Sequence, residues 1–263
     1  SVRDFAQAEI APRVREIDSQ ERIPPEIVRG MARLGLLAPV CSEEYGGAGM
    51  DWTMAAIAAE ELGRADISLA IPVLYLVEAA WGFVFDRYGP PELKAEILPR
   101  VTASEAFLGI ATTEPGGGSD ILGACRTRAV RQGDEWLLNG EKVFISGVRE
   151  SLEMGGIHLM LARTDPDPAA EHRAFTFFAL PLKGTAGITP TYFDDMGRMG
   201  ISTGGFALED VRLPAGHQVG ELNRGFYHAM EGFSAARVLI GATCVGAAEA
   251  VLEMGTRLSS ESR

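Results

Sequence analysis

The chain has 263 residues, of which 46% are hydrophobic and 23% are charged, and it carries a formal net charge of −12 at pH 7. A chain of this length is expected to form about two domains at roughly 150 residues each. The negative charge argues against nucleic-acid binding, because such a site needs a basic stripe that displaces counterions from phosphates. It suits a soluble protein or one with a basic protein partner.

Cysteine usage and the apolar segments predict a cytoplasmic protein. Cys41, Cys125 and Cys244 lie far apart and lack Cys-x-x-Cys spacing, so we expect neither a disulfide framework nor a zinc site. A reducing compartment is then the simplest location. The opening Ser-Val-Arg-Asp-Phe lacks the pattern of a signal peptide. The apolar run over residues 238–251 is short and contains Glu249, so we expect no membrane span.

The first hundred residues show helical periodicity. Residues 3–19 place apolar side chains at mixed three- and four-residue spacing among charges, which is typical of an amphipathic surface helix. Proline is tolerated in a first helical turn and glycine readily ends a helix, which predicts a helix that Pro24 and Pro25 open and Gly35 ends. Three more helices are expected: one that Asp51 caps and that runs through Leu62, a mostly apolar central one over residues 67–88, and one that starts at Pro90 and Pro91.

After Ser104 the pattern changes to strands. β-Branched and aromatic residues occur in short runs broken by turn signals, as expected for antiparallel strands. Asn139 and Gly140 both tolerate positive φ, so we expect a hairpin turn there between strands over residues 136–138 and 143–145. Further strands are expected over residues 158–163, 174–180 and 206–213.

Helical spacing returns near the end of the chain. From Asn223 onward the apolar residues recur at three- and four-residue intervals. The sequence therefore predicts three parts: an α-helical domain over residues 1–104, a β-domain over 105–222, and a further helix over 223–263.

One glycine-rich stretch can carry chemistry. Residues 111–120 read Ala-Thr-Thr-Glu-Pro-Gly-Gly-Gly-Ser-Asp. Three consecutive glycines leave one side of the backbone bare and allow positive φ, so the main chain can lie against a flat or anionic ligand. The hydroxyls of Thr112, Thr113 and Ser119 suit a heterocycle edge or a phosphate oxygen. Taken alone, such a stretch is a surface loop more often than a cofactor site.

This decapeptide resembles the Thr-Glu-Pro-x-x-Gly-Ser-Asp signature of the acyl-CoA dehydrogenase family of flavoproteins. Three further segments match the same family in the same order: Lys-Val-Phe-Ile-Ser-Gly at 142–147, Met-Gly-x-x-x-x-x-Thr through Glu-Asp-Val-x-x-Pro at 196–214, and a helix with a Phe and an Arg at 223–237. Four ordered matches are specific, whereas any one would be weak. The resemblance implies an α+β multidomain fold with an α-helical N-terminal domain, a small antiparallel β-domain and the start of a C-terminal helical bundle.

The same resemblance implies the ligand-binding residues. FAD is expected where the β-domain meets the bundle, and the implied cofactor-binding residues are Ile110, Ala111, Thr112, Thr113, Gly118, Ser119, Phe144, Ile145 and Ser146. Acyl-CoA contacts are implied for Ser119, Ser234 and Arg237. Phe144 stands where the family has an aromatic residue behind the flavin ring. Ser146 aligns with a hydroxyl that donates toward flavin N5, where it stabilises charge as the ring is reduced.

Plainer interpretations stay open for each of these residues. The glycine-rich segment can be an ordinary turn, and Phe144 can be a core residue of a strand. Ser146 can be an exposed serine at a strand end. Arg237 can belong to a structural salt bridge, since an arginine on an apolar helix face needs a partner.

The catalytic residues remain unassigned. The family often has Arg where Met199 stands, and whether the adjacent Arg198 substitutes for it stays open. Oxidation at Cα and Cβ needs a carboxylate that takes the α-proton while the β-hydrogen leaves as hydride. Most members carry that Glu farther along the chain and a minority carry it at the position of Ala236, so we expect the base outside these 263 residues. Glu231 is the strongest internal alternative, although the helical period places it about 120° around the helix from Arg237.

The resemblance implies an FAD-dependent acyl-CoA dehydrogenase. Its expected electron acceptor is an electron-transfer flavoprotein, and its expected assembly is a homotetramer or homodimer. An acyl-CoA oxidase of the same fold and a non-catalytic FAD- or acyl-CoA-binding subunit stay open as alternatives. The histidines lack metal-ligand spacing, so no metal is expected, and no Gly-x-Ser-x-Gly elbow supports hydrolysis. The acyl group cannot be inferred, because much of its pocket is expected outside these residues.

Overall fold

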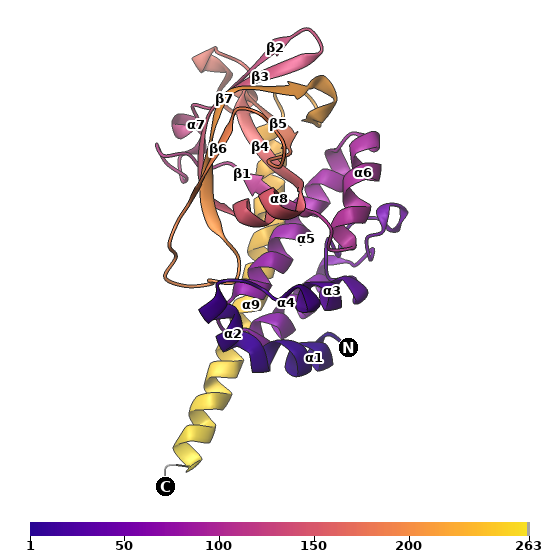
Figure 1. Ribbon diagram of the computed structural model, residues 1–263, viewed down its shortest axis with the longest axis vertical. Coiled ribbons are helices and arrows are strands. Elements are labelled where there is room, and N and C mark those ends of the chain that lie inside the picture. The colour runs from indigo at the N-terminus through magenta and orange to yellow at the C-terminus, as the bar shows by residue number, and fades with distance from the viewer. Residues whose placement is uncertain (262–263) are drawn as a thin grey trace.

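The computed structural model describes residues 1–261 and has a helical part, a sheet and one long helix that contacts both (Figure 1). The helices of the N-terminal part are α1 Val2–Phe5, α2 Val14–Gln20, α3 Pro25–Arg33, α4 Trp52–Ala65, α5 Ala70–Tyr88 and α6 Pro91–Thr102. Two short helices, α7 Ile121–Ala124 and α8 Val148–Met154, lie between strands. The long helix α9 spans Gly225–Glu261 and extends beyond the other elements at its C-terminal end (Figure 1).

The predicted helix starts near Pro25, Asp51 and Pro91 are confirmed, whereas the central helix begins at Ala70 and not at residue 67. Pro25 lies in the first turn of α3, and the Asp51 side chain caps α4 by accepting a hydrogen bond from the backbone N–H of Met54 at 2.8 Å. The expected first helix is less regular than its periodicity indicated. A π-helical turn at Ala6–Ile10 and a 3-10 turn at Ala11–Arg13 separate α1 from α2. Pro12 explains the break, because proline has no N–H for the helical ladder.

The central helix α5 is buried on almost every side, as its composition predicted. It carries one charged residue into the interior: Glu78 is 3% exposed, and its Oε2 has no hydrogen-bond partner within residues 1–261. Glu78 lines a cavity of about 470 Å³ between α3, α5 and α8. Burial raises the pKa of Glu78 well above its ordinary value, so we expect the carboxyl to be neutral in the folded protein.

Within residues 1–261, eight strands form one mixed sheet. They are β1 Phe107–Ala111, β2 Arg128–Gln132, β3 Glu135–Ser146, β4 Gly156–Arg163, β5 Phe175–Leu180, β6 Ile188–Tyr192, β7 Thr203–Pro214 and β8 Gln218–Val219. Their order is β6-β7-β3-β2-β4-β5-β8, and β1 pairs with β4 outside this path. The predicted β-domain is confirmed, but the sheet is not purely antiparallel, because β1 and the start of β2 run parallel to β4. Intervening elements between β1 and β4 return the chain in the same direction.

The expected hairpin at Asn139 and Gly140 is wrong. Both residues lie inside the single strand β3, which shifts register against β7 between Leu138 and Gly140. The Asn139 amide donates to Asp210 Oδ1 at 3.0 Å, and a Cβ on Gly140 would lie 2.5 Å from Thr127 Cα. The positive φ of Gly140 therefore belongs to a bulge in β3, at a point where the backbones of Gly140 and Thr127 lie close together. The hairpin turn occurs earlier, between β2 and β3, whose end residues Gln132 and Glu135 are paired.

The sheet is packed on both faces. One hydrophobic core joins α4, α5 and α9 to one face, and a second core that includes Trp136, Phe178 and Phe206 lies on the other. This explains why β4 and β5 are buried along nearly their whole length. They read as continuous apolar runs because both of their faces are covered.

Helix α9 approaches α4 very closely. A Cβ on Gly246 would lie 1.9 Å from the Glu60 carbonyl oxygen, and one on Gly63 would lie 2.3 Å from the Thr243 carbonyl oxygen. The outer face of α9 exposes large apolar side chains, namely Val238, Ile240, Val245, Val251, Leu252 and Met254. By length and composition α9 could also cross a membrane, which is weak evidence because core helices of soluble proteins pass the same test. The expectation of no membrane span stays a prediction.

We expect Glu78→Gln to stabilise the protein more at pH 8 than at pH 5. The pKa of Glu78 in the folded protein lies above its unfolded value near 4.5. The stability that protonated Glu78 contributes is therefore fully present below pH 4.5, and it is lost as the pH rises toward the folded pKa. Glutamine has no proton to lose. Urea unfolding at both pH values measures the difference, which grows by at most about 1.4 kcal/mol per pH unit. Glu96→Gln on the exposed face of α6 is the control. An equal gain at both pH values would contradict a neutral Glu78.

Candidate functional site

A bulge near the end of β3 presents Phe144 to solvent. The register against β7 shifts between Lys142 and Ile145, and Phe144 has φ of 57°. In a regular strand Phe144 would share a face with buried Lys142, because side chains alternate. The bulge instead leaves Phe144 69% exposed, with its ring centroid 5.4 Å from that of Phe193. Phe144 is therefore not a core residue, and it offers a flat apolar face to a ligand.

Ser146, the last residue of β3, is held from two sides. Its carbonyl oxygen lies 3.2 Å from Nε2 of the buried His158. Burial lowers the pKa of His158 to about 4, so the ring is neutral and Nε2 donates to the carbonyl. On the other side, Nη1 of Arg198 donates to Ser146 Oγ at 3.2 Å. The hydroxyl is half-buried and fixed in place.

The glycine-rich segment forms a tight loop after β1. The Gly117 N–H donates to the Glu114 carbonyl oxygen at 3.0 Å, and Gly117 has φ of 148°. Asp120 caps the short helix α7 by accepting from the Gly123 N–H at 2.9 Å. Gly116, Gly118 and Ser119 remain exposed. The loop thus offers bare backbone and one free hydroxyl to solvent.

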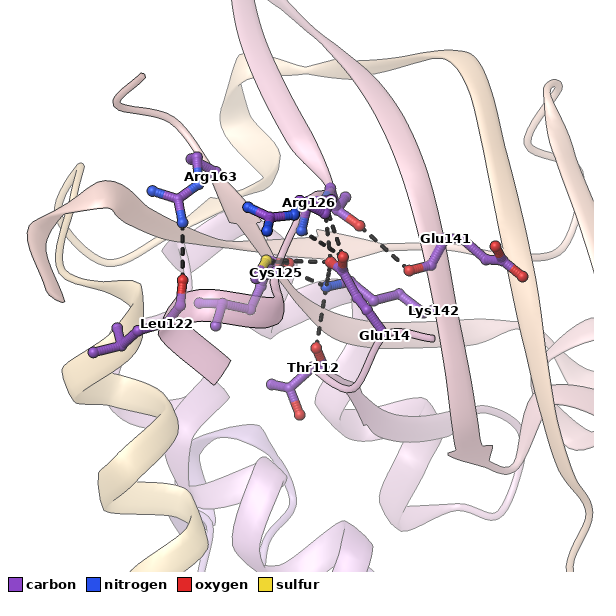
Figure 2. A network of polar contacts seen from close by, with 10 residues as sticks. Thr112, Glu114, Leu122, Cys125, Arg126, Glu141, Lys142 and Arg163 are labelled. Atoms are coloured by element: carbon purple, nitrogen blue, oxygen red, sulfur yellow. Dashed lines mark hydrogen bonds and ion pairs between the residues drawn. The ribbon is translucent and has the colours of Figure 1, made fainter. Parts of the chain in front are cut away.

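A buried polar network lies behind this loop (Figure 2). Lys142 Nζ is 2.7 Å from Glu114 Oε1 and 3.2 Å from the carbonyl oxygen of Thr112. The Glu114 carboxylate also accepts hydrogen bonds from the backbone N–H groups of Arg126 and Thr127. The Lys142 side chain is fully buried and that of Glu114 is 4% exposed. The network ties the loop after β1 to β3 and to the start of β2.

The carboxylate of Glu114 stays ionised in this network. Burial alone would raise its pKa, but the charge and hydrogen bond of Lys142, with the amide donors, bring the pKa below its ordinary value. The thiol of Cys125 lies 3.2 Å from Glu114 Oε1. Burial raises the pKa of Cys125 to about 11, which keeps it a thiol that can donate to the carboxylate. The three cysteines, all within the described residues, are unpaired.

The predicted cofactor-binding residues lie on two neighbouring segments, with different exposure. The side chains of Ala111, Thr112 and Ile145 are buried, so only their backbone groups can meet a ligand. Ile110, Thr113 and Ser146 are partly exposed, and Gly118, Ser119 and Phe144 are exposed. The Val143 N–H donates to the Thr113 carbonyl oxygen at 3.0 Å, which links the two segments directly.

The predicted substrate residues of α9 are both exposed. Ser234 Oγ donates to the Met230 carbonyl oxygen at 2.9 Å. Within residues 1–261 Arg237 makes no ion pair, and its guanidinium lies 6.0 Å from the Phe233 ring centroid. The salt-bridge interpretation of Arg237 is therefore wrong for this part of the chain. Because the side chain reaches solvent, it needs no buried partner.

Glu231 is already engaged on the other side of α9. Its Oε2 accepts from the hydroxyl of Tyr88 at 2.6 Å, and its Oε1 lies 3.0 Å from Nη1 of Arg87. The Tyr88 ring stacks on His228 with centroids 3.9 Å apart. Glu231 thus joins α9 to the C-terminal end of α5. This arrangement disfavours it as a proton-abstracting base.

Three contacts of the site escaped sequence reasoning: Lys142 with Glu114, His158 with the Ser146 carbonyl, and Arg198 with the Ser146 hydroxyl. Arg198 was considered only as a substitute for the family arginine at Met199. A fully buried lysine is rare unless it is paired, but only the structure shows that Lys142 is buried. His158 and Arg198 depend on strand pairing and on a loop that returns from the helical part. No local pattern reports those contacts.

The exposed groups fit FAD. A flat heterocycle can pack on Phe144, an acceptor atom can bind the Ser146 hydroxyl, and an anionic group can meet the bare backbone of residues 116–118. Within residues 1–261 no cluster of three or more His, Cys, Asp or Glu side chains is arranged to hold a metal ion.

Comparison with known proteins agrees with this architecture. The family models "Acyl-CoA dehydrogenase, N-terminal domain" and "Acyl-CoA dehydrogenase, middle domain" match residues 1–105 and 109–211. Cyclohex-1-ene-1-carbonyl-CoA dehydrogenase of Syntrophus aciditrophicus is 36% identical over 99% of this chain and 61% of its own length. The 3-(aryl)acrylate reductase of Clostridium sporogenes is 33% identical over 98% of this chain and 67% of its own. A glutaryl-CoA dehydrogenase structure from Mycobacterium smegmatis in complex with FADH2 is 30% identical, with a TM-score of 0.84 over 96% of this chain and 61% of that one.

The chain belongs to the acyl-CoA dehydrogenase family. It spans 61% and 67% of the length of the two curated relatives named above. The family assignment therefore rests on the helical N-terminal part, the sheet and helix α9.

Removal of the Lys142 charge is expected to destabilise the fold strongly. Lys142→Met leaves the Glu114 carboxylate buried without its cation, which costs about 3–5 kcal/mol of unfolding free energy. Addition of Glu114→Gln should recover part of that loss, because neither buried group is then charged. Denaturant titration measures both. Arg212→Met, which breaks the exposed pair with Glu135 at 3.1 Å, is the matched control and should change little. A loss no larger than that of the control would show that the buried pair does not stabilise the site.

Proposed function

We propose that the protein carries out FAD-dependent α,β-dehydrogenation of an acyl-CoA thioester. In this reaction a carboxylate base takes the α-proton and the β-hydrogen leaves as hydride to the flavin. The observation that carries the proposal is the juxtaposition of Phe144 and Ser146 at the bulged end of β3, beside the glycine-rich loop. Family membership and the FADH2-containing structure of a relative support the same chemistry.

FAD, when bound, supplies a hydride acceptor at its N5 atom. The residues of this chain would bind and orient it. Phe144 packs against one face of the ring, and the hydroxyl of Ser146 donates a hydrogen bond where negative charge develops. The backbone of the loop at residues 116–118, with Ser119, binds anionic or polar groups. Arg237, exposed on α9, is free to contact the acyl-CoA.

The partners follow from the same proposal. We propose an electron-transfer flavoprotein as the electron acceptor and a homotetramer or homodimer as the assembly. The apolar outer face of α9 suits the packing of further helices or subunits. An oxidase that passes electrons to oxygen is the nearest alternative, and stopped-flow reoxidation by air separates the two. One relative is named 3-(aryl)acrylate reductase, so a protein similar to this chain is named for a reaction in the reducing direction.

We expect Ser146→Ala to slow flavin reduction by acyl-CoA while binding changes little. The hydroxyl acts on charge that arrives during hydride transfer, so its loss should lower the anaerobic reduction rate roughly tenfold, which is about 1.4 kcal/mol. Stopped-flow absorbance of the bound FAD measures the rate in the complete protein. Ser19→Ala, on the exposed surface of α2, is the control. Equal rates for Ser146→Ala and its parent, with FAD bound in both, would remove Ser146 from the proposed role.

We expect Glu231→Gln to retain bleaching of the flavin by acyl-CoA. Glu231 holds Tyr88 and Arg87 in the structure, so the base is proposed to be a different carboxylate, outside residues 1–261. Tyr88→Phe removes the same hydrogen bond without changing the carboxylate and should have a similarly small effect. If Glu231→Gln abolishes bleaching while FAD stays bound and Tyr88→Phe does not, Glu231 is the base.

A further inference from the structure

The loop between β6 and β7 brings an arginine to the hydroxyl that faces the proposed flavin site. Arg198 Nη1 donates to Ser146 Oγ at 3.2 Å, and its Nη2 donates to Thr203 Oγ1. Ser146 and Thr203 are opposite each other in the pairing of β3 with β7. One guanidinium therefore fixes a hydroxyl on each of the two strands at this end of the sheet.

The loop that carries Arg198 is anchored to the helical part. The N–H of Ile23 donates to the carbonyl oxygen of Gly200 at 3.1 Å, and a Cβ on Gly200 would lie 2.5 Å from the Ile17 side chain. Arg198 itself has φ of 48°, a left-handed conformation that costs energy for a residue with a side chain. The helical part thus holds the backbone in a strained form that aims the guanidinium at Ser146.

The hydrogen-bonding groups around Ser146 determine where its hydroxyl proton points. A guanidinium can only donate, so its bond to Ser146 Oγ uses an oxygen lone pair and leaves the hydroxyl proton unused. Within residues 1–261 that proton has no protein acceptor. It is available to a ligand atom in front of the strand end.

The positive charge of Arg198 is only weakly balanced. Asp195 Oδ2 lies 4.0 Å from Nη2, and no closer carboxylate contacts the guanidinium within residues 1–261. The Arg198 side chain is 25% exposed, so solvent screens its charge only in part. A charge at this point acts on Ser146 directly and favours the donation of its proton.

We propose that Arg198 is a positioning residue: it orients the Ser146 hydroxyl as a donor to the bound flavin and thereby favours flavin reduction. This inference rests on the proposed function, because it needs FAD at the end of β3. Without Arg198 the hydroxyl can rotate and donate elsewhere, and the reduced flavin loses a preorganised hydrogen bond. In this proposal Arg198 influences the flavin through Ser146.

A double-mutant cycle on the reduction potential tests this. The potential of FAD in the complete protein is measured by enzymatic reduction with a reference dye and without acyl-CoA. Arg198→Met should lower the equilibrium constant for two-electron reduction about tenfold, which is about 30 mV. In the Ser146→Ala background the same substitution should have almost no effect, because the hydroxyl through which it acts is gone. Arg198→Lys, which keeps a donor, should fall between Arg198→Met and the parent.

The controls separate orientation from bulk charge and from folding. Arg149→Met removes an arginine of α8 that donates to the Glu21 carbonyl oxygen and lies over Tyr192, and it should leave the potential unchanged. If Arg198→Met does not fold, the cycle is run with Arg198→Lys, whose smaller effect should also vanish with Ser146→Ala. An unchanged potential in folded, FAD-containing Arg198 variants would overturn the proposal. The proposal would also be overturned if Arg198→Met lowered the reduction potential equally in the parent and in the Ser146→Ala variant.

The outcomes also distinguish this inference from the proposed function. If the parent protein binds no FAD, both the proposed function and the role of Arg198 are rejected. If acyl-CoA reduces the FAD of the parent protein and the Arg198 variants have the same reduction potential as the parent, the proposed function stands. Only the role of Arg198 is then rejected.

Discussion

The ion pair between Lys142 and Glu114 is the constraint on which the site depends. Two charges taken out of water are costly, and the cost is tolerated only where geometry and further hydrogen bonds satisfy the remaining donors and acceptors. Here backbone N–H groups of Arg126 and Thr127 and the carbonyl of Thr112 supply them. The glycine-rich loop, β2 and β3 must therefore keep one relative arrangement, and the groups that are proposed to face the flavin are held by the same three segments.

Local strain on this rigid frame produces the ligand-facing surface. Phe144 and Arg198 are both non-glycine residues with left-handed φ; Phe144 stands two residues before Ser146 in β3, and Arg198 donates to the Ser146 hydroxyl. Such conformations persist only when the surroundings enforce them, and they gather at functional sites. The bulge in β3 exposes the aromatic ring, and the anchored loop delivers the guanidinium.

The helical part contributes more than a cover for the sheet. It anchors the loop that contains Gly200, and through α4 and α5 it packs against α9 at distances that only glycine allows. α9 continues past these contacts with an exposed apolar face (Figure 1). Relatives of this chain are longer, and that face is where further helices of the family fold are proposed to pack.

The sequence by itself determined the element types, the helix starts and the family, because proline and capping signals, hydrophobic periodicity and ordered motifs are local properties. It also predicted Ser146 and Phe144 as ligand-facing positions, through resemblance alone. Tertiary structure decided the rest. Strand pairing turned the Asn139–Gly140 hairpin signal into a bulge, because the long partner strand β7 continues past it. The second bulge exposes Phe144 and so removes the alternative that Phe144 is a core residue. The partners of Glu114, Ser146 and Glu231 come from segments 28, 52 and 143 residues away in the chain, and no short-range pattern can report contacts that only the folded backbone brings together.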